Sequence, residues 1–207
     1  MEQTTRTFFF DIETIPTEAA IREKPLLEVQ LELDHEAVIK KLSLSAITAR
    51  ILCLGYAVEP PGESPIHVIH GDERDILESF WRLAADIELF VGHNILDFDL
   101  RFIYQRSIIQ RIRPSREIPF ARNRSAPVYD TMHEWTRWGR DAISLDLLCR
   151  ALGLESPKQM LDGSKVYPYY CDGKLAEICE YCQRDVETVR RVYRRMTFTD
   201  QNGPDNA

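Results

Sequence analysis

An uninterrupted apolar run near the N-terminus, Thr7-Phe8-Phe9-Phe10, is the feature that most restricts the fold of this chain. A run of β-prone residues that does not alternate with polar ones is typical of a strand buried on both faces. Two acids, Asp11 and Glu13, follow the run directly. We therefore expect a central strand whose end carries two carboxylates.

Later segments predict the other elements of the domain. Apolar runs bounded by turn residues predict strands over 51–58, 66–69, 89–92 and 128–132. Helical spacing predicts helices that begin at Asp72 or Asp75, over 97–110, from 144 to about 153, and over 174–196. Strands come mostly early and helices mostly late, with helices also between strands. This order predicts an α/β domain with a mixed sheet.

The length of 207 residues suits one domain, which we place at residues 1–198. Within it, residues 17–49 change to charged, helix-forming residues and predict a helical insertion of unknown role. Residues 199–207 are polar and predict a disordered tail.

Charge and cysteine usage limit the class of protein. There are 26 Lys and Arg against 33 Asp and Glu, a net charge of −7, which at first argues against a nucleic-acid partner. No apolar run approaches the roughly 20 residues of a membrane span, and the first residues do not resemble a signal peptide. The five cysteines lack disulfide-framework spacing, which suits a reducing compartment. These patterns predict a cytoplasmic location.

Three polar clusters carry the candidate chemistry. Asp11 and Glu13 are two apart on a strand and share a face. Asp99 follows the 89–92 strand, and Tyr181 and Asp185 are four apart on the last helix. Singly, each cluster is also compatible with a solvated strand end, a helix cap or a surface acid.

Together the four acids predict a site for hard divalent cations. Carboxylates without His or Cys suit Mg²⁺ or Mn²⁺ better than Zn²⁺. Two such ions about 4 Å apart can activate a water molecule and stabilise a leaving oxygen in phosphodiester hydrolysis. Without metal, four converging carboxylates would repel one another strongly.

With these clusters in this order, the chain resembles the DEDD superfamily of 3′–5′ exonucleases, which has a ribonuclease H-like fold. The matching motifs are Phe10-Asp11-Ile12-Glu13-Thr14, Asn94-x-x-x-Phe98-Asp99 and Tyr181-x-x-x-Asp185. Tyr181 marks the tyrosine subtype (DEDDy). With Ile15-Pro16 added, the first motif is similar to stand-alone predicted exonucleases related to the proofreading domain of family B DNA polymerases.

The resemblance implies a role for each matching residue and a ribonuclease H-like, mixed five-stranded sheet flanked by helices. Asp11, Glu13, Asp99 and Asp185 would hold two Mg²⁺ or Mn²⁺ ions, and Tyr181 would orient the attacking water. The terminal nucleotide would be held by the backbone beside Ile12 and Thr14 and by the side chains of Asn94 and Phe98.

The expected function is a metal-dependent 3′–5′ exonuclease. It would release nucleoside monophosphates from single-stranded 3′ ends, with DNA favoured over RNA. One alternative is a catalytically silent nucleic-acid-binding module of the same fold, and another is an RNA-processing exoribonuclease.

Several further residues have an ordinary structural explanation beside a functional one. Cys179 and Cys182 have zinc-knuckle spacing but lack a second ligand pair, so core packing is the better account. His93 is expected to support its loop by a hydrogen bond, and Asp130 to be solvated or to cap a helix. Residues 101–124 hold seven arginines and one acid, a charge of +6. Both this stretch and the last helix are candidate phosphate contacts. The arginines on the last helix are Arg184, Arg190, Arg191, Arg194 and Arg195.

Overall fold

The computed structural model describes residues 5–23, 34–59, 64–121, 123–156 and 163–200, which contain a five-stranded sheet. β2 is antiparallel to β1 and β3, whereas β4 is parallel to β1 and β5. The order across the sheet is β3-β2-β1-β4-β5, so β1 is central. The predicted mixed sheet is confirmed. Its strands are β1 (Thr7–Pro16), β2 (Ala49–Glu59), β3 (His67–His70), β4 (Leu89–Gly92) and β5 (Val128–Asp130).

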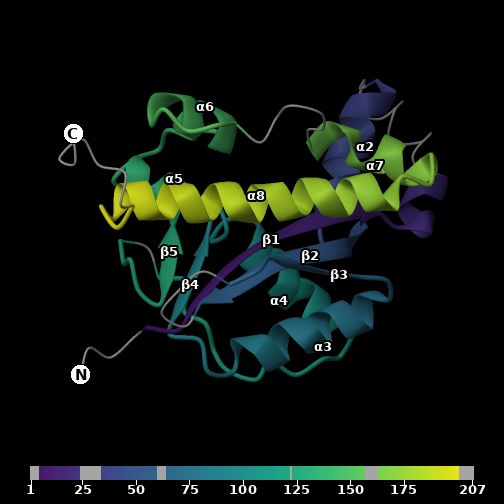
Figure 1. Ribbon diagram of the computed structural model, residues 1–207. Coiled ribbons are helices and arrows are strands. Elements are labelled where there is room, and N and C mark those ends of the chain that lie inside the picture. Colours follow the sequence, from purple (N-terminus) through teal and green to yellow (C-terminus); the bar gives the residue numbers. More distant parts are fainter. Residues whose placement is uncertain (1–4, 24–33, 60–63, 122, 157–162, 201–207) are drawn as a thin grey trace.

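Helices cover both faces of this sheet. The long helix α8 crosses one face, and α3 and α4 lie on the other, while α2 and α7 lie together beside the C-terminal end of β1 (Figure 1). None of the helices in the described residues has the length and apolar character needed to cross a membrane. The helices are α2 (His35–Ser43), α3 (Glu73–Ala84), α4 (Asp99–Ile109), α5 (Thr131–Trp135), α6 (Leu145–Ala151), α7 (Val166–Cys171) and α8 (Leu175–Met196), with a 3₁₀ turn over Gly163–Lys165.

The side chains of β1 alternate between two cores. Phe8 and Phe10 pack in the core that contains the buried residues of α3 and α4. Phe9 and Ile15 pack against buried side chains of α8. The two acids of the first motif lie between Phe9 and Ile15, so the same alternation turns them toward α8.

The expected end of the first strand was wrong. β1 continues through the acids to Pro16, and it pairs with β2 from Thr7 to Pro16. Apolar residues between and after the acids, such as Ile12 and Ile15, remain buried and keep the strand inside the sheet. The register shifts between Glu13 and Thr14, where β2 carries an extra residue, and such a bulge increases the local twist of the strands.

Other boundaries differ in detail. The last predicted strand stops at Asp130, because the side chain of this residue caps α5. The short helix α7 was not predicted. In the 17–49 segment, residues 18–23 and α2 are helical, whereas residues 24–33 lie outside the described residues. That this segment is an insertion stays a prediction. Most of the expected disordered tail, residues 201–207, also lies outside the described residues.

Candidate active site

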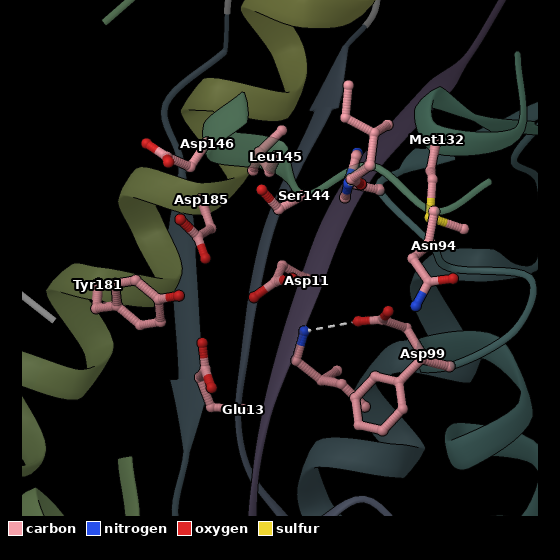
Figure 2. A pocket seen from close by; sticks show the side chains of 15 residues that line it. Asp11, Glu13, Asn94, Asp99, Met132, Ser144, Leu145, Asp146, Tyr181 and Asp185 are labelled. Carbon is pink, nitrogen blue, oxygen red and sulfur yellow. Dashed lines mark hydrogen bonds between the residues drawn. The ribbon is translucent and has the colours of Figure 1, made fainter. Parts of the chain in front are cut away.

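Three elements bring the five predicted catalytic side chains to one cleft of about 490 Å³. β1 supplies Asp11 and Glu13, the first turn of α4 supplies Asp99, and α8 supplies Tyr181 and Asp185. The carboxylates of Asp11, Glu13 and Asp185 and the hydroxyl of Tyr181 point toward a common centre (Figure 2). Residues separated by up to 174 positions in the sequence therefore form a single cluster.

Burial distinguishes these side chains from ordinary surface acids. Glu13, Asp99 and Asp185 have exposed fractions of 8%, 3% and 9%, and Asp11 is half-buried. Tyr181 is 7% exposed, and its apolar ring packs in the cluster that includes Ile15. A buried carboxylate is costly unless it is paired, hydrogen-bonded or bound to a metal.

Asp99 is tied to the strand that carries the other acids. Its Oδ1 accepts a hydrogen bond of 3.1 Å from the backbone N–H of Ile12 (Figure 2). This N–H is available because the pairing of β1 with β4 reaches only to Phe9. Asp99 thus lies beside the backbone between Asp11 and Glu13.

The acids repel one another in the absence of a cation. Burial, followed by the charges of neighbouring carboxylates, raises the pKa of both Asp11 and Glu13 well above its usual range. Burial raises the pKa of Asp99 to about 7, although backbone hydrogen bonds oppose this rise. The pKa of Tyr181 is also raised, first by burial and then by the charges of Asp185 and Glu13. An oxygen-only donor set with this excess of negative charge fits a hard divalent cation.

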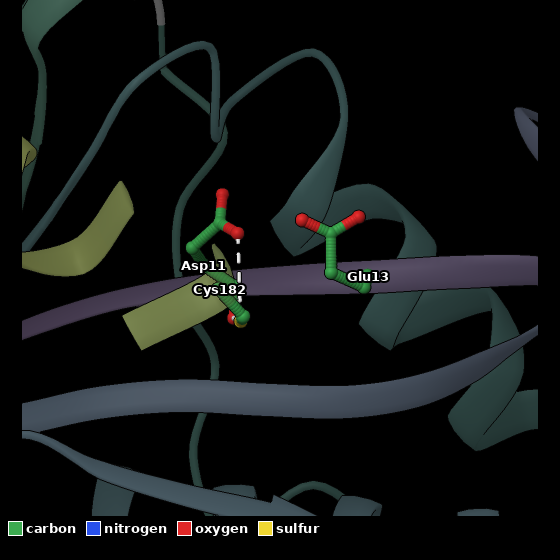
Figure 3. A group of neighbouring side chains, drawn as sticks. All are labelled: Asp11, Glu13 and Cys182. Carbon is green, nitrogen blue, oxygen red and sulfur yellow. Dashed lines mark hydrogen bonds between the residues drawn. The ribbon is translucent and has the colours of Figure 1, made fainter. Parts of the chain in front are cut away.

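Cys182 completes the surroundings of Asp11. Its Sγ lies 3.5 Å from the backbone oxygen of Asp11 and 3.6 Å from Oδ2, as a hydrogen-bond donor (Figure 3). One ligand atom each from Asp11, Glu13 and Cys182 lie within 4.8 Å of one another. The thiol orients the Asp11 carboxylate, a role that the cysteine spacing did not reveal.

Asp130 holds the loop that leads to Asp99. It is fully buried, and Oδ1 and Oδ2 accept hydrogen bonds from the N–H groups of Asn94 (2.9 Å) and Leu96 (3.0 Å). Oδ1 also accepts from Met132 and His133 and so caps α5. The expectation of a capping residue is confirmed and that of a solvated one is wrong. The bond across 36 residues was missed because it leaves no local pattern.

His93 supports the same loop, as predicted. Its Nε2 donates to the backbone oxygen of Ile143 at 2.9 Å, and Nδ1 lies 2.9 Å from the Thr131 hydroxyl. Burial lowers the pKa of His93, so the neutral ring is favoured. Both ring nitrogens are engaged in structural contacts.

The four predicted substrate contacts do not share one pocket. Ile12, Asn94 and Phe98 line the cleft that holds the acids. Thr14 instead lines a second pocket, which Ile12 and Phe98 also line. The hydroxyl of Thr14 donates to the backbone oxygen of Ser43 at 2.8 Å. Its side chain therefore attaches α2 to β1.

The predicted basic surface on α8 is largely neutralised. Arg190 is buried and pairs with Glu59, which also pairs with Arg194. Two further pairs are Arg191 with Glu187 and Arg195 with Asp200. In the 101–124 stretch, Arg106 is buried against Glu73 at 2.6 Å. Burial and ion pairing therefore give Arg106 and Arg190 a structural role. Phosphate contact by the more exposed arginines stays a prediction.

A comparison with family models identifies the chain. Residues 63–203, about two thirds of the sequence, match a family described as predicted 3′–5′ exonuclease related to the exonuclease domain of PolB. The chain belongs to this family. The match includes Asp99, Tyr181 and Asp185 but begins after Asp11 and Glu13. The fold brings these two acids into one cleft with the matched residues Asp99, Tyr181 and Asp185. No curated protein has a sequence that matches the chain.

A solved structure with the same fold supports the architecture. The family B DNA polymerase from the hyperthermophilic archaeon Pyrobaculum calidifontis superposes with a TM-score of 0.65 at 16% sequence identity. The superposition covers 93% of this predicted exonuclease and 24% of the polymerase chain, so our chain spans about a quarter of that protein's length. The predicted ribonuclease H-like fold is confirmed.

Proposed function

We propose that this chain is a metal-dependent 3′–5′ exonuclease of the DEDD tyrosine subtype. Its substrates would be single-stranded 3′ ends, DNA in preference to RNA, and its products nucleoside monophosphates. The observation that carries the proposal is the convergence of Asp11, Glu13, Asp99 and Asp185 with Tyr181 in one cleft. Membership in the exonuclease family supports the same reaction.

The acids divide into two sets of cation ligands. Asp11, Glu13 and Asp185 would hold one Mg²⁺ or Mn²⁺ ion, while Asp11 and Asp99 would hold the second. When bound, such ions lower the pKa of a water molecule and stabilise a leaving oxygen. Asp99 keeps its position through the Ile12 N–H, and Asp11 through the Cys182 thiol.

Tyr181 serves this reaction as a hydrogen-bond donor. Because burial and the nearby acids raise its pKa, the phenol stays protonated at neutral pH and is a poor general base. The hydroxyl points toward the centre of the acid cluster (Figure 2). Its role is to orient the attacking water.

The test is the hydrolysis of matched DNA and RNA oligonucleotides, each labelled at the 5′ end, in Mn²⁺. We expect stepwise shortening of DNA from the unlabelled 3′ end, and loss of this activity in Asp11→Ala and Glu13→Ala. Asp86→Ala is a matched control, since Asp86 and Glu88 have the same spacing but Asp86 is an exposed partner of Arg6.

Each other outcome rejects part of the proposal. Binding without hydrolysis would mean a catalytically silent module. Preferential shortening of RNA would mean an exoribonuclease, and release of the 5′ label would contradict the proposed polarity. Unchanged hydrolysis in the Asp11 and Glu13 variants would place the active site elsewhere.

A further inference from the structure

A second pocket of about 490 Å³ lies beside the acid cleft. Three residues line both spaces: Ile12, Glu13 and Phe98. The remaining wall comes from Thr14 on β1, from α2 and its C-terminal cap Leu44, and from residues 163–167, where α7 begins. α2 lies outside the residues that match the exonuclease family, whereas residues 163–167 lie within them.

The wall is firmly attached to the core. Thr14, which follows Glu13 in the sequence, donates a hydrogen bond of 2.8 Å to the backbone oxygen of Ser43 at the end of α2. The buried guanidinium of Arg106 donates to the backbone oxygen of Ala46 at 2.9 Å. A backbone bond of 2.8 Å joins Thr17 to Thr48. The C-terminal end of α2 is therefore held in a fixed position beside the acids.

Lys40 gives the second pocket a cationic group. Glu13 and Lys40 are the charged side chains that line it, and Glu13 also belongs to the proposed cation site. Among the described residues, no acidic side chain forms an ion pair with Lys40. An exposed ammonium group beside a cation-binding centre suits a phosphate group.

The apolar lining suits a base. Phe98 and Tyr167 present aromatic rings, and Leu44 is 55% exposed although it is apolar. Aromatic and aliphatic side chains of this kind bind bases by stacking and contact without selecting a particular sequence. A lysine suited to phosphate, together with an apolar wall, is the combination expected of a nucleotide subsite.

Size and position connect this subsite to the reaction. A volume of about 490 Å³ lies in the range of small-ligand sites, and the two pockets meet at Glu13 and Phe98. A phosphodiester that is hydrolysed beside Glu13 has one nucleotide on each side. We propose that the α2–α7 pocket binds one of these two nucleotides, with Lys40 contacting a phosphate and Tyr167 contacting the base. This inference rests on the proposed function.

The first test measures binding of a single-stranded oligonucleotide at several salt concentrations. An Asp185→Asn background prevents hydrolysis under the proposed mechanism. Lys40→Gln should lower the slope of log K against log salt by about 0.7, the change for one lost phosphate contact on a single strand. Lys41→Gln is the matched control, because Lys41 is the exposed neighbour on α2 and does not line the pocket. Tyr167→Leu should weaken binding at least about fivefold through the lost stacking.

Kinetics with the active chain give the second test. Lys40→Gln and Tyr167→Leu should raise KM and leave kcat unchanged, with thermal unfolding as a check on folding. If both variants bind and hydrolyse like the parent while Asp11→Ala is inactive, the subsite is wrong and the proposed function stands. If the parent does not hydrolyse nucleic acid but Lys40→Gln still lowers the salt slope, the proposed function fails, and the pocket keeps only a role in binding nucleic acid.

Discussion

Asp11 lies opposite Gly55 in the antiparallel pairing of β1 and β2. A Cβ atom on Gly55 would lie 2.9 Å from Sγ of Cys182 and 3.1 Å from the backbone oxygen of Cys182. The missing side chain at position 55 therefore lets α8 approach the sheet directly behind Asp11. Because α8 carries Tyr181 and Asp185, this close approach sets the geometry of the whole acid cluster.

Gly55→Ala should displace α8 and impair the site. The new methyl group meets a backbone atom as well as a side chain, so the helix itself must shift. We expect a loss of about 1 to 3 kcal/mol in the free energy of unfolding, as for other overpacked cores, and at least a tenfold loss of exonuclease activity. Cys182→Ala in the same chain should restore part of the stability by removing the Sγ contact. Denaturant unfolding and oligonucleotide hydrolysis measure both effects, and parental values for Gly55→Ala would contradict this account.

The buried acids make the stability of the metal-free protein depend on pH. Burial raises the pKa of Asp99 from 3.8 to about 7, so the folded state binds more protons than the unfolded state between these values. The stabilisation from protonating Asp99 is complete below the unfolded pKa and is lost as pH rises through about 7. Asp99→Asn should therefore raise the melting temperature in EDTA at pH 8 and change it little at pH 4.

A matched comparison isolates this effect from other titrating groups. The difference in melting temperature between Asp99→Asn and the parent is measured from pH 4 to 8.5, with and without Mg²⁺. We expect the difference to grow with pH in EDTA and to shrink or reverse when the cation is present. A difference that stays constant with pH in EDTA would show that burial does not raise the pKa of Asp99.

Local spacing predicted that Asp11 and Glu13 share a face of a strand and that Tyr181 and Asp185 share a face of a helix, and both pairs line one cleft. That the cleft is an active site stays a prediction. The same kind of spacing could not predict the partners that hold these acids. Asp130 reaches backbone groups in a distant loop, and Cys182 reaches Asp11 only because Gly55 admits α8. The end of β1 was misplaced for a related reason. The acids interrupt the apolar run after Phe10, although the buried alternation continues beyond them.

Asp130→Asn should loosen the loop that carries Asn94 and leads to Asp99. An amide keeps one acceptor oxygen where the carboxylate offers two, so at least one of the N–H groups of Asn94 and Leu96 loses its buried acceptor. We expect a loss of about 1 to 3 kcal/mol in unfolding free energy and a higher Mn²⁺ concentration for half-maximal activity. Asp72→Asn is the control, since Asp72 caps α3 away from the cleft. An unchanged Mn²⁺ requirement for Asp130→Asn would limit Asp130 to a role in stability.

Tyr181→Phe separates the orienting role of the phenol from acid–base catalysis. Because burial and the charges of Asp185 and Glu13 raise the pKa of Tyr181, the group should not titrate in the working range of the enzyme. Loss of the hydroxyl should lower kcat about 10- to 100-fold, the rate equivalent of losing one hydrogen bond to a charged group. The shape of the pH–rate profile between pH 6 and 9 should stay the same, as should the melting temperature. Single-turnover hydrolysis of a 5′-labelled oligonucleotide across this range is the measurement. If the parent shows an alkaline or acidic limb that Tyr181→Phe abolishes, Tyr181 transfers a proton and does not merely orient the water.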